Sequence, residues 1–189
     1  MPPKARITRD MIVDAAFRIA RDQGVEKITA RTVSQMLNCS TQPVMYHFKK
    51  IEDIKKAAAQ KADEFHSAYL MNIPGENPLL EIGLRYIHFG RYEKNLFRLL
   101  FQSNWFSGKD MGELVGDPQL EEILDILSRE ASITEAQAKQ AFRTMFLTVH
   151  GYASMFVNND IPYREEEVAQ DLQLIFNGVI CALREGHPQ

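Results

Sequence analysis

The sequence predicts an all-α protein. Nearly every periodic segment of its 189 residues repeats apolar side chains at helical spacing, and no stretch alternates like a half-buried strand for more than a few residues. The charge is also unevenly divided. Residues 1–63 hold 12 Lys/Arg and 7 Asp/Glu, a net +5, whereas residues 64–189 carry a net −8. A basic N-terminal segment is typical of a nucleic-acid contact, with a solvated basic face as the alternative on charge alone.

Four helices are predicted in the first 71 residues. The first begins after Thr8, a suitable N-cap, and ends at Gly24. The second begins near Thr29, and the third is a short helix that follows a break of about three residues and runs to Phe48. A fourth helix covers about 51–71. Two short helices joined by a three-residue turn, after a longer helix, describe a helix-turn-helix unit.

The third helix has the chemistry of a reading helix. Its sequence from Ser40 is small, polar and uncharged at the end that would enter a DNA groove. Val44 and Phe48 lie four residues apart and are expected to pack inward, which leaves the polar side chains outward. A Gln amide in such a helix can bind adenine N6 and N7 together.

At these residues the chain resembles the TetR/AcrR family of one-component repressors over residues ~6–56. The matching segments run in order from Gly24-Val25 through Thr29-Ala30-Arg31, Cys39-Ser40-Thr41-Gln42-Pro43 and Tyr46-His47-Phe48 to Lys49-Lys50-Ile51-Glu52-Asp53-Ile54. The chain departs from the pattern at Asn38, Met45 and Ile51, where the family usually has glycine, tyrosine and lysine.

The resemblance implies a DNA-contacting set in which Thr41 and Gln42 meet base edges. It implies that Tyr46 and His47 approach the DNA backbone and that Thr29 and Arg31 hold phosphate. From its chemistry, Met45 is expected to make an apolar contact with a thymine methyl. Lys49 and Lys50, with Lys4 and Arg6, are expected to add affinity for phosphates. For each residue, a solvated side chain is the alternative. The whole set is Thr29, Arg31, Ser40, Thr41, Gln42, Met45, Tyr46, His47, Lys49 and Lys50.

Pro74, Gly75 and Pro78 mark the expected boundary between a DNA-binding domain, residues 1–56 with a linking helix to about 71, and a helical ligand-sensing and dimerisation domain, residues 72–189. Helices are expected over 78–95, 118–130, 134–157 and 163–184, with a short apolar turn over 97–101. Thr134 and Gln137 have the spacing of a capping box. The last two helices have surplus apolar faces, and the resemblance implies that they form a homodimer.

Aromatic side chains gather between residues 89 and 106. Such surface either lines a ligand cavity for a small apolar or aromatic effector or is ordinary core. Polar groups that could anchor an effector are His88, Arg91 and His150. For His150 a satisfied buried structural histidine is the better explanation, and effector binding is the second. The candidate pocket consists of His88, Phe89, Arg91, Tyr92, Phe101, Trp105, Phe106 and His150.

Enzyme and membrane classes find no support in the sequence. It lacks GxGxxG, GxxxxGK[ST], HExxH and GxSxG motifs and has no cysteine pair with zinc spacing, so no catalysis, cofactor or metal is expected. No apolar run approaches a membrane span or a signal peptide, which predicts a cytoplasmic protein. The expected function is a ligand-responsive transcriptional repressor that binds a palindromic double-stranded operator as a homodimer. The alternatives are a helical small-molecule-binding or interaction module without specific DNA binding, and an enzyme that uses the aromatic region.

Overall fold

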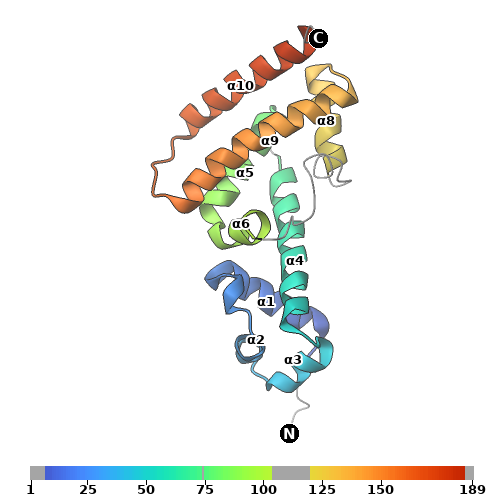
Figure 1. Cartoon of the computed structure of the whole chain (residues 1–189), viewed down its shortest axis with the longest axis vertical. Helices are drawn as coiled ribbons and strands as arrows, with labels where there is room; N and C mark the ends of the chain where they lie inside the picture. Colours follow the sequence, from blue (N-terminus) through green and yellow to red (C-terminus); the bar gives the residue numbers. More distant parts are fainter. Residues whose placement is uncertain (1–6, 74, 104–119, 186–189) are drawn as a thin grey trace. The chain divides into compact units, whose positions relative to one another are not determined.

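A computed structural model describes residues 7–73, 75–103 and 120–185, and within these ranges it contains helices and no strand (Figure 1). The all-α prediction is therefore confirmed for the described residues. A short 3₁₀ helix, η1, follows the first α-helix. The elements are α1 (Arg9–Gln23), η1 (Val25–Lys27), α2 (Ala30–Met36), α3 (Thr41–His47), α4 (Ile51–Met71), α5 (Pro78–Tyr92), α6 (Lys94–Phe101), α8 (Glu121–Ala131), α9 (Glu135–Asn158) and α10 (Glu165–Glu185).

The predicted start and stop of α1 are confirmed. Thr8 has extended backbone, and its hydroxyl oxygen accepts a hydrogen bond of 3.3 Å from the amide of Met11. At the other end, Gly24 has φ +95°, and its amide donates to the carbonyl of Ala20 at 2.9 Å. Glycine suits this position because a Cβ would strain a backbone with positive φ.

The chain divides into two compact units. One consists of Met1–Ala68 with Glu93–Trp105, and the other of Tyr69–Tyr92 with Phe106–Gln189. In the first unit α1 packs against α2, α3 and α6, and α2 packs against α3. Its core is made of side chains with at most 1% of their surface exposed, namely Ile12, Ala16, Ile19, Ala20, Ile28, Val33, Val44, Ile54, Ala58, Ala59, Ala62, Leu96, Phe97 and Leu100.

The predictions for the segment between residues 78 and 101 are wrong in two respects. A single helix is expected over 78–95 from the sequence, whereas α5 ends at Tyr92. The expected apolar turn over 97–101 is instead the second half of α6. The break falls at Glu93, whose φ of −111° and ψ of 48° do not continue a helix.

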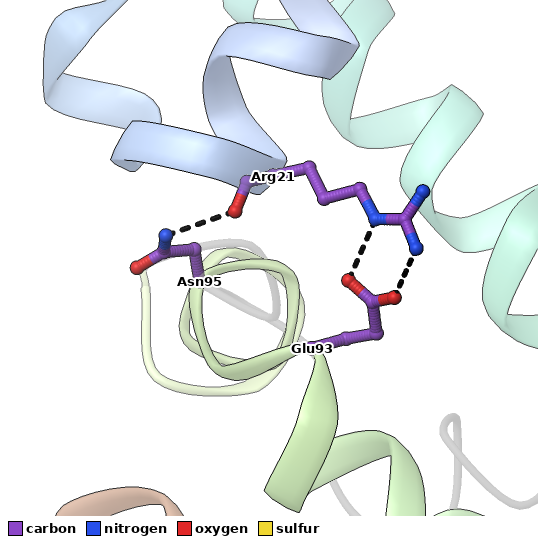
Figure 2. A network of polar contacts seen from close by, with 3 residues as sticks. All are labelled: Arg21, Glu93 and Asn95. Atoms are coloured by element: carbon purple, nitrogen blue, oxygen red, sulfur yellow. Dashed lines mark hydrogen bonds and ion pairs between the residues drawn. The ribbon is translucent and has the colours of Figure 1, made fainter.

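Polar contacts to α1 explain why the helix breaks there (Figure 2). The Glu93 carboxylate accepts from both Arg21 Nε, at 2.8 Å, and Arg21 Nη2. The side-chain amide of Asn95 donates to the backbone carbonyl of Arg21 at 2.9 Å. These bonds join the C-terminal turn of α1 to the start of α6, at the residue where the helical backbone is interrupted.

In the second unit α9 packs against α5, α8 and α10, and α10 also packs against α5. The capping box predicted for α9 is confirmed, since Thr134 accepts from the Gln137 amide at 3.3 Å and the Gln137 side chain accepts from the Thr134 amide at 2.9 Å. Gly83 permits the close approach of helices here. A Cβ at this residue would lie 3.3 Å from Leu172 of α10 and 3.5 Å from Val149 of α9.

The remaining helix ends lie close to their predicted positions. The helix expected over 118–130 is observed as α8, with its first two expected residues outside the described ranges. α10 begins two residues after its expected start. None of the helices in the described ranges has the length and apolar character needed to cross a bilayer.

Candidate nucleic-acid interface

The turn between α2 and α3 has a defined hydrogen-bonded geometry. Asn38 has φ +50°, the Asn38 amide donates to Gln35 at 3.2 Å, and the Cys39 amide donates to Ser34 at 3.0 Å. These two bonds, together with the left-handed backbone of Asn38, form a Schellman motif, which ends α2 and redirects the chain. Asparagine tolerates left-handed backbone better than most residues do, so Asn38 can serve where the resembling family has glycine.

The orientation predicted for α3 is confirmed at its clearest positions. Val44 and Phe48 are buried, with 0% and 3% of their surface exposed, whereas Thr41 and Gln42 are exposed and Tyr46 is 74% exposed. Met45 is only half-buried, so it presents less surface than its neighbours. The helix therefore rests on apolar side chains and presents hydroxyl, amide and phenol groups outward.

At the start of α2, Thr29 is already engaged in the helix cap. Its hydroxyl oxygen accepts from the Thr32 amide at 3.1 Å, and the Thr32 hydroxyl donates to the Lys27 carbonyl at 2.7 Å. The Thr29 side chain is nevertheless exposed, and so is the guanidinium-bearing side chain of Arg31 in the first turn of the helix.

Cations surround the C-terminal end of α3. Lys49 and Lys50 are exposed, and the Lys49 ammonium lies 5.7 Å from the centre of the Tyr46 ring. The guanidinium of Arg9 lies 4.7 Å from the centre of the Phe48 ring. Ser40, at the opposite end of α3, is exposed and makes no side-chain cap bond.

His47 lies at this end as well, with a partner in its own chain. Its Nε2 lies 3.0 Å from the carbonyl oxygen of Ile7, so Nε2 carries the proton and donates. Neither Ile7 nor Arg9 was identified from the sequence, because nothing local in the sequence links residues about 40 positions apart. Hydrogen-bonding side chains of α2 and α3 thus lie in the same part of the chain as Lys49 and Lys50. Proteins use such groups to contact bases and phosphates.

Among the described residues of the candidate effector pocket, His88, Arg91 and Tyr92 lie on the last turns of α5, next to the start of α10. His88 Nε2 lies 2.8 Å from a carboxylate oxygen of Glu165, and the guanidinium of Arg91 lies 5.7 Å from the Tyr92 ring centre and 5.1 Å from the Tyr163 ring centre. Burial and the neighbouring Glu165 carboxylate raise the pKa of Tyr163.

His150 belongs to a different set of contacts in the same unit. Its Nδ1 lies 3.0 Å from the hydroxyl oxygen of Tyr86, and its ring lies against Phe146 of the same helix, with centroids 5.6 Å apart. Burial lowers the pKa of His150 and raises that of Tyr86, so both groups are neutral near pH 7. This is a neutral hydrogen-bonded pair on an otherwise apolar face.

Two aromatic residues of the candidate pocket have ring partners of their own. Phe89 is fully buried in the second unit and contacts Tyr69, with ring centroids 5.7 Å apart. Phe101 belongs to the first unit and contacts His66, with centroids 5.1 Å apart. Trp105 and Phe106 lie outside the described residues.

Comparison with known proteins gives one informative similarity. No protein-family model matches the chain. The chain is 22% identical over 193 residues to the protein named "Uncharacterized HTH-type transcriptional regulator YobS" from Bacillus subtilis (strain 168), and the alignment covers 97% of this chain and 96% of that protein. The similarity therefore extends through both units, and it supports the class of DNA-binding transcription regulators.

Proposed function

We propose that this protein is a transcription regulator of the TetR/AcrR type, which binds a palindromic operator as a homodimer and is released by a small apolar or aromatic molecule. The observation that carries the proposal is the exposed polar face of α3, held over a buried core and flanked by lysines. The relative's name as an HTH-type transcriptional regulator supports the same class. A repressor role follows from the resembling family.

In this proposal α3 reads the major groove. The exposed side chains of Thr41 and Gln42 contact base edges, and half-buried Met45 offers its methyl group to a thymine. Contacts to the sugar–phosphate backbone position the helix without reading sequence. Those contacts come from Thr29, Arg31, Ser40, Tyr46, His47, Lys49 and Lys50.

Base reading and backbone affinity can be separated with two substitutions of exposed residues. Gln42→Ala is expected to lose ~1–3 kcal/mol of binding free energy on the best operator and to relax discrimination at one base position. The reason is that an amide hydrogen-bonded to a base edge distinguishes one base from another. Lys49→Ala is expected to weaken binding to all DNA sequences equally. It should also reduce the slope of log binding constant against log salt concentration by ~1. Fluorescence anisotropy on matched and mutated duplexes measures both. If Gln42→Ala leaves the sequence preference unchanged, this residue does not read a base.

The homodimer is supported by an uncovered face on α9 and α10. On α9, Leu147, Gly151 and Met155 are spaced four residues apart and so share one face of the helix. The side chains of Leu147 and Met155 are 55% and 53% exposed. On α10, Leu174 is 73% exposed, and Gly178 follows four residues later. A Cβ added at either glycine would meet no atom of the described residues within 4 Å, so packing among these residues does not require glycine there. Close approach by helices of a second copy would use both features.

Dimerisation through this face predicts a strong effect of charge at its most exposed apolar residue. Leu174→Glu is expected to weaken the dimer at least about 100-fold, because an unpaired carboxylate at a buried interface costs several kcal/mol and 1.4 kcal/mol is tenfold in affinity. Sedimentation velocity over a concentration series measures the change. Gln173→Glu adds the same charge at the adjacent exposed residue and should leave the dimer intact. Equal sedimentation of the two variants would place the interface elsewhere.

The effector site is proposed within the second unit, where polar groups meet aromatic rings at two places. One is the group of His88, Arg91 and Tyr92 with Tyr163, and the other is the pair of His150 and Tyr86. Phe89 is buried in the same unit. The sequence also predicts Phe101, Trp105 and Phe106 for an effector site, and for these residues it stays a prediction. Addition of apolar aromatic compounds to the protein–operator complex tests this part, and release of DNA by none of them would contradict it.

A further inference from the structure

The first residue of α1 places a cation against the end of α3. The Arg9 guanidinium carbon lies 4.7 Å from the centre of the Phe48 ring, and Phe48 is 3% exposed, whereas Arg9 itself is exposed. A ring packed in a core has little freedom to move. A guanidinium over an aromatic face is attracted to the ring and keeps the N–H groups at its edge turned to the surroundings. Phe48 therefore holds Arg9 in place while its donors stay open to a ligand.

The charge of Arg9 is not balanced by a carboxylate in the described part of the chain. The ion pairs among these residues include neither Arg9 nor the two lysines that follow α3. In the same unit, by contrast, Arg21 at the other end of α1 is paired with Glu93. An arginine without a carboxylate partner contributes its full positive charge to the local potential, which attracts phosphate groups.

His47, the last residue of α3, has already used a donor within its own chain. Its Nε2–H donates to the carbonyl of Ile7 at 3.0 Å. In this tautomer Nδ1 has no proton, so it accepts hydrogen bonds and cannot donate one to a phosphate oxygen. Ile7 lies two residues before Arg9, so the bond restrains the chain that leads into Arg9. His47 therefore serves the packing of this junction, and Arg9 is a group there that can donate to a phosphate.

We propose that Arg9 is a phosphate-contacting residue of the DNA interface, held in position by the Phe48 ring, and that it makes the backbone contact which the family resemblance gives to His47. The inference rests on the proposed function. A guanidinium binds phosphate oxygens through paired N–H groups, and such a contact positions the protein on the duplex without reading a base. Arg9 therefore adds affinity for every DNA sequence and places α3, while the choice of sequence stays with α3.

The salt dependence of DNA binding tests the contact. Arg9→Gln should bind a selected operator about fivefold more weakly and lower the slope of log binding constant against log salt concentration by ~0.9, the value for one phosphate contact. Arg9→Lys should keep most of the slope but lose about twofold in affinity, because an ammonium lacks the paired N–H groups of a guanidinium.

Arg18→Gln is the matched control for this measurement. Arg18 is exposed on α1 and lies nine residues after Arg9, which places it on the opposite side of the helix. The salt slope of Arg18→Gln should equal that of the parent protein. An unchanged slope in Arg9→Gln, or an equal fall in both variants, would overturn the proposal.

A double-mutant cycle tests the role of the Phe48 ring. Phe48→Leu keeps an apolar side chain in the core but removes the aromatic face, and thermal unfolding shows that the variant is folded at the temperature of the binding assay. This variant should bind the operator about threefold more weakly, and adding Arg9→Gln to it should cost clearly less than the loss from Arg9→Gln alone. If the two losses multiply, the ring does not position Arg9 and the proposal is overturned.

A measurement without DNA tests the stacking itself. The Nε–H proton of an arginine over a ring face is shifted upfield by the ring current, so the Arg9 resonance in the NMR spectrum should move downfield in Phe48→Leu. An unchanged resonance would show that Arg9 does not lie on the ring. If the parent protein binds no duplex better than random sequence, the proposed function fails and the role of Arg9 on DNA fails with it. The resonance still decides whether the stacking exists, so the two failures are distinguishable.

Discussion

Phe48→Ala is expected to destabilise the N-terminal unit by about 3–5 kcal/mol, the usual cost of removing a buried phenylalanine. The ring is 3% exposed, it lies four residues after fully buried Val44, and it carries the Arg9 guanidinium on its face. Domains are stable by only about 5–15 kcal/mol, so this loss should lower the unfolding temperature substantially. Operator binding should be lost with it. Thermal unfolding followed by circular dichroism measures the effect.

Tyr46→Ala is the matched control, two residues earlier in the chain. Its ring is 74% exposed, so truncation should change stability by no more than about 0.5 kcal/mol. DNA affinity should still fall several-fold if the phenol contacts the backbone. If both variants lost the same stability, the division of α3 into a buried and an exposed face would be incorrect.

His66 is expected to make the stability of the protein depend strongly on pH. It lies on α4 and is 7% exposed, and its burial lowers the pKa from the ordinary 6.5 to about 4. Between about pH 4 and pH 6.5, His66 is therefore protonated in the unfolded chain but neutral in the folded chain. The stability that comes from a neutral His66 is fully present above pH 6.5 and is lost as the pH falls from 6.5 to about 4.

The size of this contribution follows from the pKa difference. At 1.36 kcal/mol for each pKa unit, the folded protein should lose about 3 kcal/mol across this range because of His66 alone. Urea unfolding at several pH values, compared between the parent and His66→Leu, isolates the contribution from those of other groups, including His150. The variant should show a shallower pH dependence, while Gln60→Ala, an exposed change on the same helix, should follow the parent. Identical pH dependence of parent and His66→Leu would contradict the burial of a neutral imidazole.

Local chemistry explains which features the sequence predicts well. The caps at Thr8 and Thr134 and the stop at Gly24 depend on residues within one helical turn, so neighbouring residues in the sequence are sufficient to predict them. The inward positions of α3 follow from four-residue spacing. The helix-turn-helix arrangement and its outward polar side chains are therefore predictable from local sequence alone.

Contacts between distant residues explain what the sequence did not predict. The helix break at Glu93 depends on Arg21, 72 positions earlier, and the partner of His47 lies 40 positions earlier. Phe89 and Phe101 are close in sequence but belong to different units, and the sequence does not indicate that the chain passes from one unit to the other at Glu93. Periodicity contains no information about such pairings.

Selection of bound duplexes from a random DNA library with the purified protein tests the central claim most directly. The account predicts enrichment of one pseudo-palindromic sequence, with half-site centres about one helical turn, ~34–36 Å, apart, because each subunit offers one reading helix. Gln42→Ala protein should enrich a sequence relaxed at one position in each half-site. A folded, dimeric protein that enriches no sequence over the starting library would contradict the claim that α3 reads DNA.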